Sequence, residues 1–231
     1  MVDALDPHDL TTIGARVLGV LLEKQLTTPD AYPLTLNSLT NGCNQTSNRE
    51  PVVQYEPYQV ETAALALKSQ GLVRVVHPGS GERATKYRQV ADEALRLAPP
   101  ERALVCALLV RRSPQTASEL KTRSERLHPF SSTTEVEATL DVLASRSQPL
   151  VAPVEPRAGQ KERRWLQLLE TDAAGRAASS ASASITGSTR GGTRLDELEE
   201  RLAALEARVA TLVEALGDLV ELPESPDASG R

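Results

Sequence analysis

The same order of secondary-structure signals occurs twice in this chain of 231 residues. In each copy, apolar residues at helical spacing predict three helices, and a β-rich stretch broken by a polar turn then predicts a hairpin. The first copy places its helices at about 9–25, 34–43 and 58–70 and its strands at 72–76 and 85–90. The second copy places its helices at about 101–110, 117–127 and 132–145 and its strands at 149–152 and 163–169.

Three helices followed by a hairpin form the order of a winged helix-turn-helix domain. The sequence therefore predicts a mainly α fold with small β-hairpins: two tandem winged helix-turn-helix domains plus a C-terminal coiled-coil helix. Two unrelated small α+β units are the alternative that the same pattern allows. The expected segments are a first domain at 1–92, a second domain at 97–170, a flexible Ala/Ser/Gly linker at 171–193, the coiled coil at 194–222 and a disordered tail at 223–231.

Local signals support two of the helix boundaries. Gly71 follows the third helix of the first copy, at a position where a left-handed backbone ends a helix at little cost. Thr116, with Glu119 three residues later, has the spacing of a capping box and predicts the start of a helix at Ala117.

A seven-residue repeat of apolar positions follows the linker. Two series offset by three residues form its seam: Leu195, Leu202, Val209 and Leu216, and Leu198, Leu205, Leu212 and Leu219. This spacing is typical of a coiled coil. Arg194 and Glu199 then occupy positions that attract each other across a parallel pair, which favours a homodimer. A trimer, or a helix folded back onto the domains, remains open.

Composition and motifs argue against catalysis, a cofactor, a metal and a membrane segment. Aromatic residues make up only 3% of the chain, so its cores are expected to be aliphatic. Cys43 and Cys106 are far apart and are expected to be reduced core residues. No histidine has the spacing of a metal ligand, and no Gly-rich loop leads into a helix. The N-terminus lacks an apolar signal segment and the longest apolar run is short, so a cytoplasmic, non-enzymatic protein is expected.

Basic residues in the two hairpins are candidates for contact with DNA phosphates. In the first hairpin they are Arg83, Lys86 and Arg88, and in the second they are Lys161, Arg163 and Arg164. The alternative is an ordinary solvated hairpin whose cations block edge-to-edge pairing.

The third helices differ in charge. The helix at 132–145 is acidic, so the second domain is expected to contact protein rather than DNA. The helix at 58–70 is neutral, and Gln59 and Gln70 are its candidates for reading bases.

A polar loop from Cys43 to Pro51 connects the second and third helices of the first copy. Asn44, Gln45, Asn48 and Arg49 could contact a ligand, but the same residue types often satisfy their own backbone. The structural role is favoured because a long ordered loop needs internal hydrogen bonds. Arg49 and Glu50 are a candidate internal ion pair.

Several of these segments resemble the YceH-like family of bacterial tandem winged-helix proteins, which are largely uncharacterised. The resemblance covers both copies and lies in Arg16, Glu23-Lys24-Gln25, Tyr32-Pro33-Leu34, the Asn44–Pro51 loop, Thr85-Lys86-Tyr87, Pro114-Gln115-Thr116, Glu119-Leu120, Glu125-Arg126-Leu127 and Glu135-Val136-Glu137. Gly14 departs from the family, where a glutamate is expected beside Ala15 and Arg16. If that glutamate normally pairs with a basic neighbour, this chain lacks the pair.

These features favour a DNA-binding protein of the transcription-regulator type. The alternative is a protein–protein interaction scaffold whose winged helices face protein. The expected partners are a second copy of the chain and either duplex DNA or an unidentified protein, with no membrane.

Overall fold

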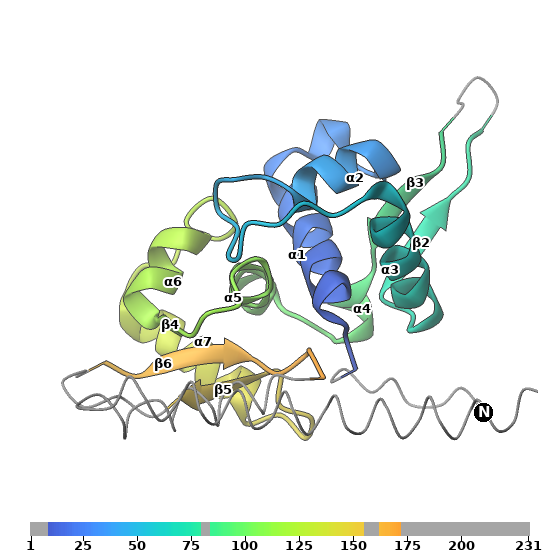
Figure 1. Cartoon of the computed structure of the whole chain (residues 1–231). Helices are drawn as coiled ribbons and strands as arrows, with labels where there is room; N and C mark the ends of the chain where they lie inside the picture. The colour runs from blue at the N-terminus through green and yellow to red at the C-terminus, as the bar shows by residue number, and fades with distance from the viewer. Residues whose placement is uncertain (1–8, 80–83, 155–161, 172–231) are drawn as a thin grey trace, which may run out of the picture. The chain divides into compact units, whose positions relative to one another are not determined.

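The computed structural model describes residues 9–79, 84–154 and 162–171, which fall within one compact unit (Figure 1). The first half contains α1 (Thr12–Thr27), the 3₁₀ helix η1 (Pro29–Ala31), β1 (Leu34–Thr35), α2 (Leu36–Cys43), α3 (Pro57–Ser69), β2 (Val73–Val76) and β3 (Lys86–Gln89). The short helix α4 (Ala91–Ala94) leads to the second half. That half contains α5 (Pro99–Val110), β4 (Gln115–Thr116), α6 (Ala117–Ser124), α7 (Thr133–Ala144), β5 (Val151–Val154) and β6 (Arg164–Gln167).

The described part of the chain is therefore a mixture of helices and two small antiparallel sheets. The repeated order of three helices and a hairpin agrees with the prediction, and most element boundaries lie within three residues of it. The expected linker, coiled coil and tail, including the seam from Leu195 to Leu219, lie outside the described residues. None of the described helices is both long and apolar enough to cross a bilayer.

Each sheet has three strands, with the last strand of its half in the middle. The strand orders are β1-β3-β2 and β4-β6-β5. Tyr87 lies between Leu34 and Val75 in the first sheet, and Trp165 takes the equivalent place in the second. Both aromatic side chains are buried, at 2% and 1% exposure, so the inner face of each sheet packs on the core.

The first strand of each sheet leads directly into a helix that a threonine caps. The Thr35 hydroxyl accepts a hydrogen bond from the amide of Ser38 at the start of α2. At the start of α6, the Thr116 hydroxyl accepts from the amide of Glu119, and the Glu119 carboxylate accepts from the amide of Thr116. This arrangement confirms the predicted capping box.

Helices α1 and α5 pack closely and join the two halves. A Cβ atom on Gly19 would lie 2.9 Å from Cβ of Leu109, so only glycine permits this approach of the two helices. The Cys106 thiol donates to the carbonyl of Gly19 at 3.4 Å. Cys43 and Cys106 are both free and buried, as expected. One apolar cluster runs through both halves, so they share a core.

The ends of the described chain also meet. The helix expected from residue 9 begins at Thr12, because Leu10 pairs instead with the segment after β6. The amide of Leu10 donates to the carbonyl of Leu169 at 2.9 Å, and the amide of Thr171 donates to the carbonyl of Leu10 at 3.2 Å.

Candidate functional site

The outer face of the first hairpin carries three cations. Arg74 and Arg88 are direct cross-strand partners, and Val76 pairs with Lys86. Because alternate residues of a strand share a face, Arg74, Lys86 and Arg88 lie on the side opposite the buried Tyr87. The Arg88 side chain is 41% exposed and lies 3.9 Å from the exposed carboxylate of Glu93. Arg83, the remaining candidate of this hairpin, lies outside the described residues.

The pairing of Arg74 with Arg88 could not be inferred from the count of basic residues alone. Like charges directly opposite one another are unfavourable in a sheet unless an anion or a carboxylate compensates them. The strand register supplies this observation, and it adds Arg74 to the candidates.

The two glutamines expected to read bases from α3 bond to the protein itself. The Gln59 side-chain oxygen accepts from the amide of Glu56 at 2.9 Å, which completes the cap of α3. The Gln70 amide group donates to the carbonyl of Asp9 at 3.2 Å. The exposed face of α3 instead presents Tyr58 and Leu65, which are 68% and 48% exposed.

The basic residues of the second hairpin face carboxylates of their own half. Arg163 lies 3.3 Å from Asp141 on α7, and its guanidinium stacks 4.4 Å from the centre of the Trp165 ring. Arg164 lies 3.2 Å from Glu119 and donates to the carbonyl of Pro114 at 2.9 Å. Lys161 lies outside the described residues.

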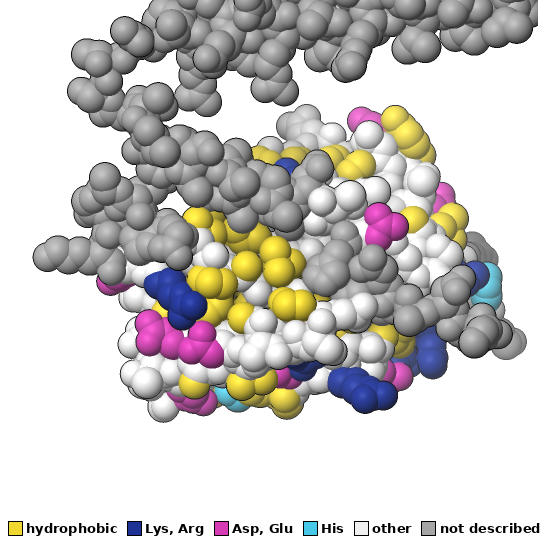
Figure 2. Space-filling model, turned by 90° about the horizontal axis from the view of Figure 1, so that it is seen from below, with side chains coloured by type: hydrophobic (Ala, Val, Ile, Leu, Met, Phe, Trp, Pro, Cys, Tyr) yellow, Lys and Arg dark blue, Asp and Glu magenta, His cyan; other side chains and the backbone are white. Residues whose placement is uncertain are grey.

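The outer face of the second sheet is largely apolar. Ala152 and Leu166 are cross-strand partners, and Val154 shares their face. Val154 and Leu166 form a small cluster separate from the main core, with Leu168 packed against it. Figure 2 views the molecule from the side on which β5 and β6 lie in Figure 1; hydrophobic side chains gather in the middle of this face and Lys and Arg lie toward its edges.

The polar loop between α2 and α3 is held by its own side chains. The Asn44 amide group donates to the carbonyl of Tyr55 at 2.9 Å and accepts from the amide of Tyr55 at 2.8 Å. Arg49 donates to the side-chain oxygen of Gln45 and to the carbonyl of Asn48, each at 3.0 Å. Asn48 adopts a left-handed backbone, with φ of 55°, which asparagine tolerates better than most residues.

Arg49 is buried and connects this loop to α1. Its Nε donates to the carbonyl of Gly42 at 2.9 Å, and its guanidinium forms an ion pair with Glu23. The expected pair between Arg49 and Glu50 is therefore wrong. The buried guanidinium of Arg49 turns toward α1, whereas the Glu50 carboxylate is 45% exposed and lies 3.5 Å from Arg111.

A second buried arginine, Arg16 of α1, binds both ends of the loop. It is 2% exposed and donates to the carbonyls of Cys43 at 3.0 Å and Pro51 at 2.8 Å. Within the described residues its guanidinium pairs with no carboxylate, which is consistent with glycine rather than glutamate at position 14. Burial lowers the pKa of Arg16.

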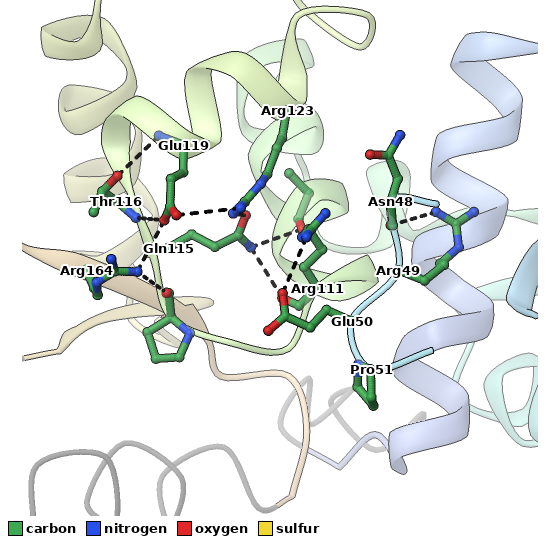
Figure 3. A network of polar contacts seen from close by, with 12 residues as sticks. Asn48, Arg49, Glu50, Pro51, Arg111, Gln115, Thr116, Glu119, Arg123 and Arg164 are labelled. Atoms are coloured by element: carbon green, nitrogen blue, oxygen red, sulfur yellow. Dashed lines mark hydrogen bonds and ion pairs between the residues drawn. The ribbon is translucent and has the colours of Figure 1, made fainter. Parts of the chain in front are cut away.

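Backbone bonds attach the polar loop to the second half. The amide of Glu50 donates to the carbonyl of Val110 at 3.2 Å, and the amide of Arg112 donates to the carbonyl of Glu50 at 3.0 Å. Figure 3 shows the Glu50 carboxylate beside Arg111 at this junction. The loop therefore connects α1 of one half with the C-terminal end of α5 in the other.

A chain of polar contacts continues from this junction into the second half (Figure 3). Gln115 is fully buried, and its amide nitrogen donates to the carbonyls of Ala107 and Arg111, each at 3.3 Å. Its oxygen accepts from Arg123. Glu119 lies 3.6 Å from Arg123 and 3.2 Å from Arg164. Burial and, secondly, the neighbouring charge of Arg111 lower the pKa of Arg123.

Sequence reasoning did not identify the residues of this junction as a group. Its members that were not candidates are Arg16, Glu23, Arg111, Gln115 and Arg123. Arg16, Glu23 and Gln115 belong to the segments that carry the family resemblance, which is the one signal that could have drawn attention to them.

The protein therefore belongs to a class with two repeated units of helices and a small sheet. The two units share one apolar core, and polar contacts between the Cys43–Pro51 loop and the C-terminal end of α5 connect them. The chain belongs to the family described as "Protein of unknown function, DUF480", which matches residues 10–160.

Three bacterial relatives, each named "UPF0502 protein", support this assignment. The chain is 44% identical to the protein of Pelobacter propionicus over 212 residues, 90% of this chain and 95% of the relative. It is 42% identical to the protein of Shewanella halifaxensis over 221 residues, covering 92% and 99% of the two chains. It is 44% identical to the protein of Cellvibrio japonicus over 216 residues, covering 91% and 96%. Membership of an uncharacterised bacterial family is therefore confirmed.

Proposed function

We propose that this chain is a non-enzymatic DNA-binding protein of the transcription-regulator type, in which the two halves are tandem winged-helix domains and the first half contacts duplex DNA. The order of three helices and a hairpin, repeated twice, supports the fold assignment. Because a fold alone does not fix a function, the proposal depends on the first hairpin. Arg74, Lys86 and Arg88 share its outer face, as a phosphate-contacting surface requires.

The second half is left out of the DNA contact for electrostatic reasons. Arg163 and Arg164 already lie beside Asp141 and Glu119. A phosphate would have to compete with those carboxylates for the same guanidinium groups. The proposal therefore assigns the phosphate contacts to the first hairpin and not to both.

The test measures binding of the full chain to a short random-sequence duplex by fluorescence polarisation, at salt concentrations from about 50 to 200 mM. The double variant Arg74→Gln/Arg88→Gln should weaken binding equally for different sequences. It should also lower the slope of log affinity against log salt by about 2, because two guanidinium groups no longer neutralise phosphates. Arg163→Gln is the matched control and should retain the wild-type slope. Absence of duplex binding by the wild-type chain at low salt would refute the proposal.

A protein-binding scaffold is the second candidate, and one observation favours it. Tyr58 and Leu65 are seven residues apart, two turns along one side of α3, and are 68% and 48% exposed. Exposed large apolar side chains on this helix suit a protein partner better than a phosphate backbone. A folded chain that fails to bind duplex at low salt would leave this candidate in place.

Self-association and location complete the proposal. The heptad seam from Leu195 to Leu219 would join two copies as a parallel coiled coil, which places two first hairpins in one assembly. The proposed location is the cytoplasm, where DNA and reduced cysteines are both found.

A further inference from the structure

A small cavity lies at the junction between the two halves. One wall is apolar and is formed by Cys106, Ala107 and Val110 of α5 and by Leu127, which follows α6. The cavity volume is about 40 Å³, several times the roughly 10–15 Å³ that one water molecule needs. It can therefore hold a group larger than a single water.

The rest of the lining contains three arginines, Arg111 at the end of α5, Arg123 on α6 and Arg126 just beyond it, together with Glu23, Thr27 and Asn48 of the first half. Arg126 is exposed, so the cavity reaches the surface beside it. Arg111 has a buried Nε for which the described structure provides no hydrogen-bond acceptor. The guanidinium of Arg126 makes no ion pair within the described part of the chain.

Positive charge exceeds negative charge around this cavity. The lining residues and their ion-pair partners comprise four guanidinium groups and three carboxylates: Arg49, Arg111, Arg123 and Arg126, and Glu23, Glu50 and Glu119. Glu23 is already engaged by the buried Arg49. Glu119 is divided between Arg123 and Arg164, at 3.6 and 3.2 Å.

The arginines are held in place without a full set of counter-charges. Gln115, itself fully buried, accepts from Arg123 and fixes the position of that guanidinium. The Glu50 carboxylate is 45% exposed and lies 3.5 Å from Arg111, which is longer than a charge-assisted hydrogen bond. Positioned arginines with donors to spare are the usual means by which proteins bind carboxylates and phosphates.

We propose that this cavity binds the oxyanion group of a small organic acid, a carboxylate or a phosphate monoester, through Arg111, Arg123 and Arg126. The apolar wall of Val110 and Leu127 receives the adjoining non-polar carbon atoms of the ligand. The bound anion lies between the polar loop of the first half and helices α5 and α6 of the second. It stabilises the contact between the halves, and it does so whether or not the chain binds DNA.

The direct test is an NMR titration of the ¹⁵N-labelled full chain, observing the arginine Nε–H signals. Inorganic phosphate and butyrate are the two probes, added against sodium chloride at equal ionic strength. At least one probe should shift the Arg111 signal saturably. A response to phosphate alone assigns a phosphate ligand, and a response to butyrate alone assigns a carboxylate. If neither probe shifts it, the proposal is overturned.

Thermal unfolding of matched variants provides a second readout. Arg126→Gln removes an exposed guanidinium without an ion pair, so the variant should keep the wild-type Tm in chloride. It should weaken binding of the effective probe about tenfold or more and lose most of the rise in Tm. Lys121→Gln, on α6 but outside the cavity lining, should retain the full rise. Phosphate also stabilises proteins non-specifically, and an equal rise in all three proteins would overturn the proposal.

Discussion

The ion pair between Arg49 and Glu23 joins the polar loop to α1, with the Arg49 side chain fully buried and that of Glu23 16% exposed. Arg49→Ala would remove this pair and the bond to the carbonyl of Gly42, and would leave a carboxylate in a largely buried position. Breaking such a pair from one side destabilises a protein by about 3 kcal/mol. Urea unfolding should show this decrease in the free energy of unfolding.

Lys68→Ala is the control for that measurement, because Lys68 is exposed near the end of α3. It should change the free energy of unfolding by no more than about 0.5 kcal/mol. If Arg49→Ala unfolds like the control yet loses binding to a ligand or partner, the loop has a functional rather than a structural role.

Two glycines of α1 should respond differently to alanine, because only Gly19 lies against α5. Alanine at Gly19 would bring Cβ within 2.9 Å of Cβ of Leu109, so the helices must separate at a cost of about 1–3 kcal/mol. Alanine at Gly14 would meet only the Thr11 hydroxyl oxygen at 3.1 Å and the Leu67 side chain at 3.9 Å. That oxygen caps α1 by accepting from the amide of Gly14, so it must shift slightly, and the gain in helix propensity, up to about 1 kcal/mol, offsets this cost; Gly14→Ala should be about as stable as wild type. Thermal unfolding of both variants tests this contrast.

The two cysteines should be unreactive in the native protein. Burial raises the pKa of Cys43 to about 12 and also raises the pKa of Cys106. The thiolate is the reactive form, so at pH 8 both residues remain protonated and inaccessible. A thiol reagent such as Ellman's reagent should label neither cysteine until urea unfolds the chain, and then label both. Rapid labelling of either one in the folded protein would contradict the packing of α1, α2 and α5.

The heptad repeat predicts a parallel pair of chains. In that arrangement Leu198 of one copy lies beside Leu198 of the other, so Leu198→Cys should form a disulfide with its own copy under mild oxidation. Non-reducing electrophoresis would detect the crosslinked dimer. In an antiparallel pair, crosslinking would require a mixture of Leu198→Cys and Leu216→Cys chains.

Local sequence signals predicted the elements of the two halves well. Thr116 and Glu119 form the expected capping box, and Gly71 has the left-handed backbone, with φ of 73°, expected after α3. These features depend on residues close in the chain. The strands β1 and β4 were missed because two residues are too few to show a period.

The candidate site depended instead on contacts between distant residues. Arg16 lies in an apolar run, and nothing near it indicates that its guanidinium reaches the carbonyls of Cys43 and Pro51. Arg49 and Glu50 are neighbours in sequence, yet their partners are Glu23 and Arg111. These partners are brought together only when segments distant in the chain pack, and the spacing of apolar residues does not indicate them.

The shared core of α1 and α5 has a consequence for the connection at α4. If the chain were cut there, each piece would expose the apolar side of one of these helices, with Gly19 and Leu109 no longer in contact. Each fragment would then expose the apolar helix surface that packs against the other fragment in the intact chain. The two pieces should therefore associate with one another when they are mixed.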